Sequence, residues 1–229
     1  MFSVASADGR LTISPQTNLM VGDERWSAVA GGCPDPYPWL VETFAPQAFL
    51  EGSGSFVLDD AAGAELPPAR EDPTRLRADY LPEQVTRAPD RRGWFTAVDG
   101  RGRVRWTIKE WPDPAFAGWH LLVLAHEQTP LAYLSFLQRE HIPYLVAGRG
   151  RVDLELALGK MADLLGVSTV VSTAGGRLNG ALIRAGLLDE VVIELFPAVI
   201  GGTATPSLFS APDLEPGQWP TRLSLLRCD

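Results

Sequence analysis

The stretch "STVVSTAGGRLNGALIRAGLLDEVVIELFPAVIGG" at residues 168–202 decides the fold, because strand and helix patterns alternate within it. Residues 168–173 are rich in β-branched side chains and predict a strand, and residues 191–200 form a second apolar run of strand length. Between the two runs, an Ala-Gly-Gly turn at 174–176 precedes a short helical segment. This order predicts two strands that are joined through a helix.

The same alternation extends upstream of this stretch. Apolar runs at residues 119–125 and 142–148 predict strands, and a leucine-spaced segment at 130–141 predicts a helix between them. Residues 152–166 predict a second helix, which begins at an N-capping aspartate and ends at a glycine. Strands and helices in this order form a mostly parallel sheet with helices on its faces, so the sequence predicts an α/β fold.

The first half of the chain is less regular. Residues 2–8 predict a strand, residues 48–58 a strand followed by a Gly/Ser turn and a short helix, and residues 93–106 a strand with a turn. Residues 221–228 have the pattern of an edge strand that closes the sheet.

Residues 59–92 are rich in Pro, Asp, Glu and Arg. A stretch of that length without a regular pattern inside a compact domain is usually a lid, an insertion or a mobile loop. We therefore expect a single domain over residues 1–229, with an insertion or mobile loop at 59–92.

The composition argues against several partners and locations. The formal net charge of −8 disfavours nucleic acid, because binding to the phosphate backbone requires a cationic surface. No apolar run approaches the roughly 18 residues of a membrane-spanning helix, and the first residues lack a signal-peptide pattern. The two cysteines, Cys33 and Cys228, do not make a disulfide framework. We expect a cytoplasmic protein that binds a small molecule.

Metal and hydrolase chemistry lack a supporting motif. The chain has neither the H-x-E nor the P-C-x-x-C element of zinc deaminases. It also lacks the G-x-S-x-G element of serine hydrolases. The sequence therefore predicts no metal site.

The Ala-Gly-Gly turn at 174–176 has two interpretations. Glycines at the end of a parallel strand let a ligand reach the backbone, and the first turn of the following helix presents unpaired N–H groups that attract phosphate. Arg177 and Asn179 would add side-chain donors in that turn. Alternatively, the glycines only allow the helix to pack closely on the strand.

Several segments together resemble a known family. These are "SADGRLT" at residues 6–12, "FLEGSGSFVLDD" at 49–60, "VDGRGRV" at 98–104 and "STAGGRLNG" at 172–180. They are similar, in the same order, to the S-x-D-G, V-G-x-G-T-x-x-x-D-D, D-x-x-G-R and E-G-G-x-x-L-N-G elements of the C-terminal reductase domain of bacterial riboflavin-biosynthesis proteins. That domain belongs to the dihydrofolate-reductase-like superfamily, so the resemblance implies that fold, NADPH as cofactor and a homodimer.

The resemblance also implies residues for each part of a site. Those expected near the nucleotide phosphates are Gly52, Ser53, Gly54, Ser55, Ala174, Gly175, Gly176, Arg177, Leu178 and Asn179. Those expected at the turn that recognises the 2′-phosphate are Asp99, Arg101 and Arg103. Those expected to flank the nicotinamide are Ala5, Val171 and Ser172. Those expected to face the substrate are Ser6, Asp8, Arg10 and Thr173.

Two departures from the family pattern bear on the substrate. Aligned without gaps through "LNG", the glutamate of the family falls on Thr173, which cannot carry a charge or act as a general acid. The basic residue that the family has just upstream of its S-x-D-G element is missing from residues 1–3. Asp8 then remains the candidate catalytic carboxylate, as a general acid or as an orienting group, although Asp-Gly is also a common turn pair.

Three hypotheses follow. The first is an NADPH-dependent reductase of a small heterocyclic or imine-like substrate, divergent from the riboflavin enzymes and suited to specialised metabolism. The second is the 5-amino-6-(5-phosphoribosylamino)uracil reductase of riboflavin biosynthesis itself. The third is an NADP-binding protein without catalysis.

Overall fold

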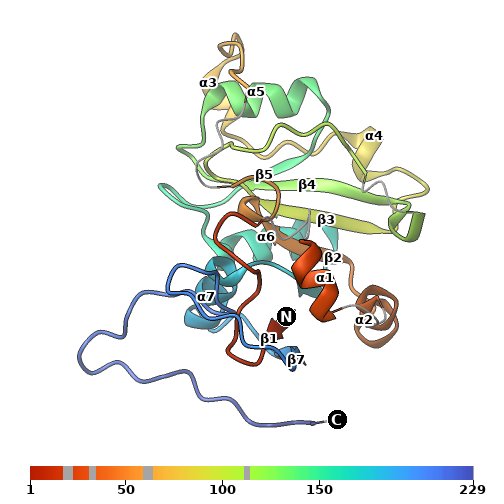
Figure 1. Cartoon of the computed structure of the whole chain (residues 1–229). Coiled ribbons are helices and arrows are strands. Elements are labelled where there is room, and N and C mark those ends of the chain that lie inside the picture. The colour runs from red at the N-terminus through yellow and green to blue at the C-terminus, as the bar shows by residue number, and fades with distance from the viewer. Residues whose placement is uncertain (18–22, 31–34, 59–63, 111–113, 229) are drawn as a thin grey trace.

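Seven strands form two parallel sheets in the described part of the chain, residues 1–17, 23–30, 35–58, 64–110 and 114–228 of the computed structural model (Figure 1). The larger sheet has the order β5-β4-β3-β2-β6, and a smaller one pairs β1 with β7. Every pairing between these strands is parallel. The strands are β1 (Phe2–Ser6), β2 (Ala48–Gly52), β3 (Gly93–Val98), β4 (Trp119–Ala125), β5 (Tyr144–Val146), β6 (Val170–Ser172) and β7 (Val192–Phe196).

Helices separate most consecutive strands, as the alternating pattern predicts. The α-helices are α1 (Glu24–Ala30), α2 (Pro36–Phe44), α3 (Pro73–Leu76), α4 (Glu83–Thr86), α5 (Leu131–Arg139), α6 (Leu154–Leu165) and α7 (Gly176–Arg184). Two short 3-10 helices are η1 (Ser53–Ser55) and η2 (Pro114–Phe116). The mixed α/β class and the mostly parallel sheet are confirmed.

The larger sheet is covered on both faces, so its central strands are apolar throughout. All seven residues of β4 are buried. Leu121 belongs to the core cluster that contains Leu134 of α5, whereas the adjacent Leu122 belongs to the cluster that contains Met161 of α6. Successive side chains of a strand point to opposite faces, so α5 and α6 cover opposite faces of this sheet.

A side-chain hydrogen bond and a left-handed glycine fix the two ends of α6, as the sequence predicts. The carboxylate of Asp153 accepts a hydrogen bond from the Leu156 N–H (3.0 Å), which caps α6. Gly166 closes the same helix in the left-handed conformation, at φ 68°.

The described part of the predicted loop at 59–92 packs against the body of the protein. Leu76 of α3 is fully buried. The Tyr144 hydroxyl donates to the Leu76 carbonyl (2.7 Å), and Tyr80 exchanges backbone hydrogen bonds with Tyr144. Lys160 of α6 pairs with Asp79 (2.9 Å). Residues 76–80 thus lie against β5 and α6, and movement of the segment 59–92 stays a prediction.

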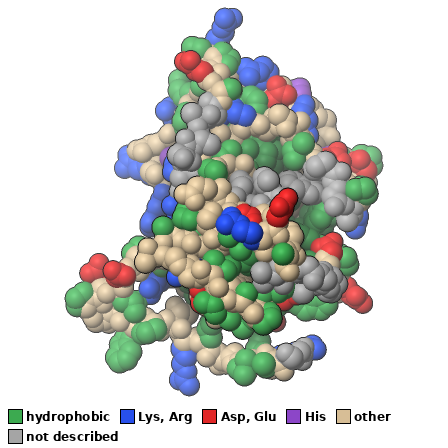
Figure 2. Space-filling model, in the orientation of Figure 1, with side chains coloured by type: hydrophobic (Ala, Val, Ile, Leu, Met, Phe, Trp, Pro, Cys, Tyr) green, Lys and Arg blue, Asp and Glu red, His purple; other side chains and the backbone are tan. Residues whose placement is uncertain are grey.

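The C-terminal segment differs from the sequence prediction. Residues 221–228 form no strand and extend away from the body (Figure 1), because a strand needs a neighbouring edge and this segment has none beside it. Trp219 and Leu225 are 87% and 85% exposed. Figure 2 shows apolar side chains along this segment, and basic side chains scattered among other types on the face of the molecule in view. None of the described helices is both long and apolar enough to cross a bilayer.

The glycines around α7 let another part of the chain approach the helix. The Ser210 N–H donates to the Gly176 carbonyl (2.8 Å). A Cβ atom at Gly176 would overlap the Ser207 carbonyl oxygen, and a Cβ atom at Gly180 would overlap the Ser210 carbonyl oxygen. Gly176 and Gly180 therefore have a packing role, but their partner is residues 207–210 and not the strand that the packing interpretation expects.

Replacing Gly176 by alanine is expected to destabilise the protein, because the overlap involves backbone that cannot move aside without breaking its own contacts. We expect a loss of about 1–3 kcal/mol in the free energy of unfolding, measured by urea denaturation. Gly159→Ala is the matched control, since Gly159 lies on the exposed side of α6 with open space at its Cβ position. That variant should gain about 0.5–1 kcal/mol from helix propensity. Equal stability of the two variants would contradict this packing.

Candidate active site

The candidate site lies where β2 and β6 end side by side. Leu50 pairs with Ser172 in register, and the Thr173 N–H donates to the Leu50 carbonyl (3.1 Å). The next residues on each strand therefore bring the loop 52–55 against the turn 173–176. Ligands of open parallel sheets bind outside the carboxyl ends of the strands, and this is such an edge.

The loop 52–55 leaves one backbone position open. Ser53 and Ser55 are buried, but Gly54 is exposed and a Cβ atom there would meet nothing within 4 Å. A Cβ atom at Gly52 would lie 3.9 Å from Leu178 Cδ2, which places this loop beside the first turn of α7. The loop can therefore present its backbone to a ligand that also reaches the start of the helix.

The buried side chain of Asn179 fixes the start of α7. No side chain caps the helix at Gly175. Asn179 is fully buried, and its Nδ2 donates to the Ala174 carbonyl (3.0 Å) and to Ser3 Oγ (3.3 Å) of β1. Arg177 is exposed on the same turn. Asn179 thus shapes the turn, while the first N–H groups of the helix, which lack an intrahelical acceptor, are the donors that can face an anion.

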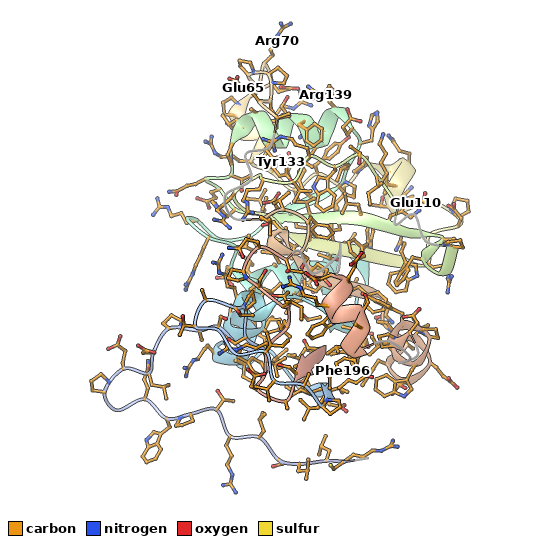
Figure 3. The ribbon with its side chains drawn as sticks, in the orientation of Figure 1. Glu65, Arg70, Glu110, Tyr133, Arg139 and Phe196 are labelled. Atoms are coloured by element: carbon orange, nitrogen blue, oxygen red, sulfur yellow. The ribbon has the colours of Figure 1, made fainter. Side chains whose placement is uncertain are left out.

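The predicted 2′-phosphate turn is built around a buried carboxylate. Asp99 accepts hydrogen bonds from the Arg103 N–H (2.9 Å) and the Val104 N–H (2.9 Å). It also shares a hydrogen bond with Tyr133, a buried residue of α5 that is labelled in Figure 3. Arg103 Nη2 donates to the carbonyl of Leu58 (2.6 Å), so its guanidinium supports the segment that follows η1. Asp99 and Arg103 therefore organise this region.

Arg101 is exposed on the same turn. A role of Arg101 or of Arg103 in binding the 2′-phosphate stays a prediction.

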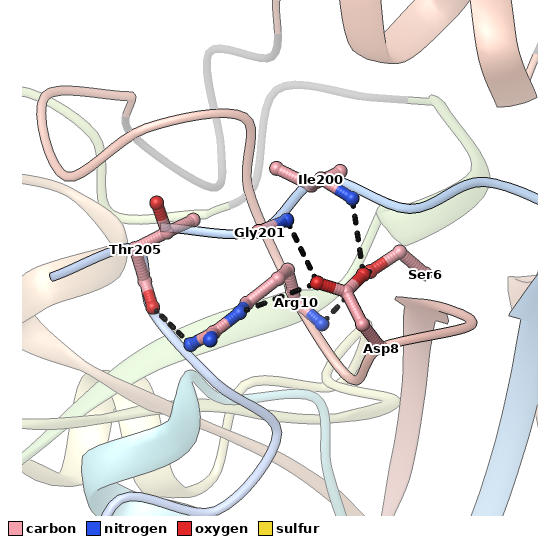
Figure 4. A network of polar contacts seen from close by, with 6 residues as sticks. All are labelled: Ser6, Asp8, Arg10, Ile200, Gly201 and Thr205. Carbon is pink, nitrogen blue, oxygen red and sulfur yellow. Dashed lines mark hydrogen bonds and ion pairs between the residues drawn. The ribbon is translucent and has the colours of Figure 1, made fainter. Parts of the chain in front are cut away.

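Asp8 joins the end of β1 to the segment after β7 (Figure 4). Its carboxylate accepts hydrogen bonds from Ser6 Oγ (2.7 Å), the Ile200 N–H (3.1 Å) and the Gly201 N–H (2.7 Å). These three bonds, that from Ser6 foremost, hold the pKa of Asp8 far below its ordinary value. An ionised carboxylate cannot donate a proton at neutral pH, so this environment favours the orienting role of Asp8 over the acid role.

Arg10 completes this network. Its Nη1 donates to the Thr205 carbonyl (2.9 Å), and its Nε lies 3.7 Å from Asp8 Oδ2 (Figure 4). The segment that carries Thr205 continues to residues 207–210, which pack against α7. The Asp8–Arg10 network is therefore connected through this segment to the start of α7.

The residues expected to flank the nicotinamide are buried: Ala5, Val171 and Ser172. The Ser172 hydroxyl has no hydrogen-bond partner among the described residues. Contact of these three residues with a cofactor stays a prediction.

A buried carboxylate that the sequence motifs do not predict lies at the centre of the candidate site. Glu51, the residue before Gly52 in β2, is only 2% exposed. Its carboxylate accepts hydrogen bonds from Thr173 Oγ1 (2.5 Å) and Ser55 Oγ (2.7 Å). Burial raises the pKa of Glu51 to about 7, although both hydroxyl groups act in the opposite direction.

A signal for Glu51 was present in the sequence. It is the one charged residue in the strand "AFLEG", and it stands where the V-G-x-G-T element has an apolar residue.

A tyrosine completes the polar cluster around Glu51. Tyr37 of α2 shares a hydrogen bond with Thr173, and burial next to Glu51 raises its pKa far above the ordinary value. Its ring packs edge-on against Phe49 at 5.4 Å between centroids. Helix α2 is set by Asp35, whose carboxylate accepts a hydrogen bond from the Tyr37 N–H (3.0 Å). Thr173 therefore links hydroxyl and carboxyl groups from α2 and β2.

One group of possible metal ligands occurs among the described residues, and it lies elsewhere. Asp90, Glu110 and His120 place one ligand atom each within 4.8 Å of the others. His120 is at the amino-terminal end of β4, the opposite end from the edge that carries the candidate site.

Comparisons with known proteins agree with this architecture. The family model described as the RibD C-terminal domain matches residues 1–228. The 2,5-diamino-6-ribosylamino-4(3H)-pyrimidinone 5′-phosphate reductase of Methanothermobacter thermautotrophicus is 30% identical over 89 residues, which are 39% of this chain and 41% of that protein. The aligned region thus spans about two fifths of this relative.

Two solved structures are similar over nearly the whole chain. A pyrimidine reductase-like protein from Corynebacterium diphtheriae aligns with a TM-score of 0.58 and 14% identity, over 96% of this chain and 82% of that one. The riboflavin biosynthesis reductase of Saccharomyces cerevisiae aligns with a TM-score of 0.56 and 11% identity, over 93% of this chain and 78% of that one. These structures define a dihydrofolate-reductase-like fold that is shared with reductases.

The chain belongs to the RibD C-terminal domain family, as the match over its whole described length shows. The relatives named above are called reductases or reductase-like proteins.

The raised pKa of Glu51 gives a pH dependence of stability with a defined sign. The folded protein binds the proton more tightly than the unfolded chain, whose glutamate has an ordinary pKa of 4.5. The contribution of Glu51 to stability therefore falls as pH rises from that value to about 7, and it is constant above.

Relative to Glu51→Gln, the wild type should lose up to about 3 kcal/mol across this range. Urea unfolding of both proteins at pH 5 and at pH 8, roughly the two sides of this range, measures the difference. A difference between wild type and variant that does not change with pH would show that Glu51 is charged throughout.

Proposed function

We propose that this protein is an NADPH-dependent reductase that transfers a hydride to a small heterocyclic or imine-like substrate. The observation that carries the proposal is the meeting of three elements at one sheet edge: the loop 52–55, the turn 173–176 and the first turn of α7. Membership of the RibD C-terminal domain family, together with the reductase relatives, supports it.

The cofactor fits this edge by charge and by space. The N–H groups at the start of α7 and the exposed Arg177 favour the pyrophosphate. Gly54 gives the nucleotide access to backbone that a side chain would otherwise cover. A bound nicotinamide supplies the hydride, and the protein supplies position and electrostatics. The substrate would lie toward Thr173 and the Ser6, Asp8 and Arg10 network.

The structure also supplies an argument for the second candidate, the riboflavin-type pyrimidine reductase. The substitution of threonine at position 173 suggested that the site had lost its carboxylate. Glu51 places a carboxyl group in hydrogen-bond contact with Thr173, so a carboxyl group is present next to that position after all. The missing basic residue upstream of the S-x-D-G element still favours a different substrate.

A homodimer in the cytoplasm is part of the same proposal. Leu195 of β7 and the tail residues Trp219, Leu225 and Leu226 are all more than half exposed. Folded monomers rarely leave so many large apolar side chains in water, so we expect a second copy to cover them. Sedimentation equilibrium should give twice the mass of 24.8 kDa. A protein that stays monomeric when concentrated would contradict the dimer.

The test of cofactor use is a calorimetric titration with NADPH and with NADH. We expect NADPH to bind more tightly and Gly54→Ala to weaken its binding by at least about tenfold, or 1.4 kcal/mol, because the added methyl group occupies the approach to the backbone. The variant should unfold like the wild type, since the methyl group has open space. Gly159→Ala, on α6, is the control that should bind normally.

The same protein is then mixed with NADPH and with the 5′-phosphorylated diaminopyrimidinone named for the archaeal relative, and separately with cyclic imines. Oxidation of NADPH with the former supports the riboflavin-type reductase, and oxidation only with the latter supports the divergent one. Tight binding without oxidation by any of them would favour the non-catalytic protein, and no binding of either nucleotide would overturn the proposal.

A further inference from the structure

Glu51 is a buried ionisable group whose presence the proposed binding residues leave unexplained. A carboxylate without water around it is costly unless other groups stabilise its charge, and its partners here are two hydroxyl groups rather than a cation. An apolar residue at the same position of β2 would avoid that cost. A buried, perturbed carboxyl group at the ligand-binding edge of a sheet is typical of a functional group.

The surroundings of Glu51 define which groups act on it. Its neighbour in register on β3 is Ala97, which carries no polar atom in its side chain. Thr173 comes from the end of β6, and Ser55 comes from η1. The titratable group that faces it is Tyr37 of α2, which stays neutral because its pKa is raised.

Protonation of Glu51 changes what the Thr173 hydroxyl offers to the site. When Glu51 is ionised, Thr173 donates its proton inward to Oε1. When Glu51 is protonated, the carboxyl O–H can donate to Thr173 Oγ1, which then turns its own proton outward. Thr173 is only partly buried, so this hydroxyl connects the enclosed carboxyl group with the side where a ligand binds.

We propose that Glu51 is a positioning residue that supplies, through the Thr173 hydroxyl, the proton which the substrate takes up during reduction. This inference rests on the proposed function. Reduction of a C=N or C=O bond adds a hydride from NADPH to carbon and a proton to the heteroatom. Thr173 gives its proton to the heteroatom and takes the proton of Glu51 in the same relay. This leaves NADP⁺, the reduced substrate and an ionised Glu51, which takes up one proton from the bulk solvent before the next turnover.

The activity test follows NADPH oxidation over a range of pH, with the diaminopyrimidinone phosphate and a cyclic imine as probes. In the wild type, kcat should fall as pH rises through the range in which Glu51 ionises. Glu51→Gln and Thr173→Val should each lower kcat by at least about 100-fold and lose this descending limb. Thr173→Ser, which keeps a hydroxyl, should retain it. The double variant should be no slower than either single variant, because both changes break one relay.

A second readout needs no turnover. Carbon-13 NMR of protein labelled at the glutamate carboxyl should show one resonance that titrates near neutral pH and is missing from Glu51→Gln. In Thr173→Val its midpoint should move to higher pH, because the hydroxyl that stabilises the charged form is gone. This measurement also applies if Glu51→Gln fails to fold.

The outcomes separate this inference from the proposed function. NADPH oxidation with an unchanged pH profile in Glu51→Gln or Thr173→Val overturns the role of Glu51 and leaves the reductase intact. No oxidation by the wild type with any probe overturns both. A Glu51 midpoint that Thr173→Val leaves in place also overturns the relay, whatever the rates are.

Discussion

The parallel pairing of β2 with β6 is the constraint on which the rest of the site depends. It brings Leu50 opposite Ser172, and the two chains then continue together into the loop 52–55 and the turn 173–176. Each chain alone would present an ordinary turn. Side by side they place an open glycine, a helix start and a buried carboxyl group at one edge of the sheet.

The small residues at this edge serve different purposes. Gly176 is needed because residues 207–210 of the same chain lie against α7. The space beside its Cα atom is therefore filled by the protein itself. A Cβ atom at Gly54 would meet no neighbour in the protein, and the proposed function assigns that open space to the cofactor. The segment after β7 also binds Asp8, and it thereby ties the end of β1 to the start of α7.

Short-range features were predictable from the sequence, and long-range contacts were not. The N-cap at Asp153 depends on residues three apart, and the buried strand 119–125 depends on its own apolar run. The hydrogen-bond partners of Glu51 are Ser55 in η1 and Thr173 directly after β6. Thr173 is far from Glu51 along the chain, so no local pattern predicts their contact. Residues 221–228 have a suitable strand pattern, but strands form only where an edge is available.

A crystal structure of the protein with NADP⁺ tests the central claim most directly. We expect the pyrophosphate within hydrogen-bond distance of the first N–H groups of α7, with the nucleotide passing over Gly54 and the nicotinamide directed toward Thr173. A nucleotide bound at another face, or a pyrophosphate held by side chains far from α7, would contradict the assignment of this sheet edge as the active site.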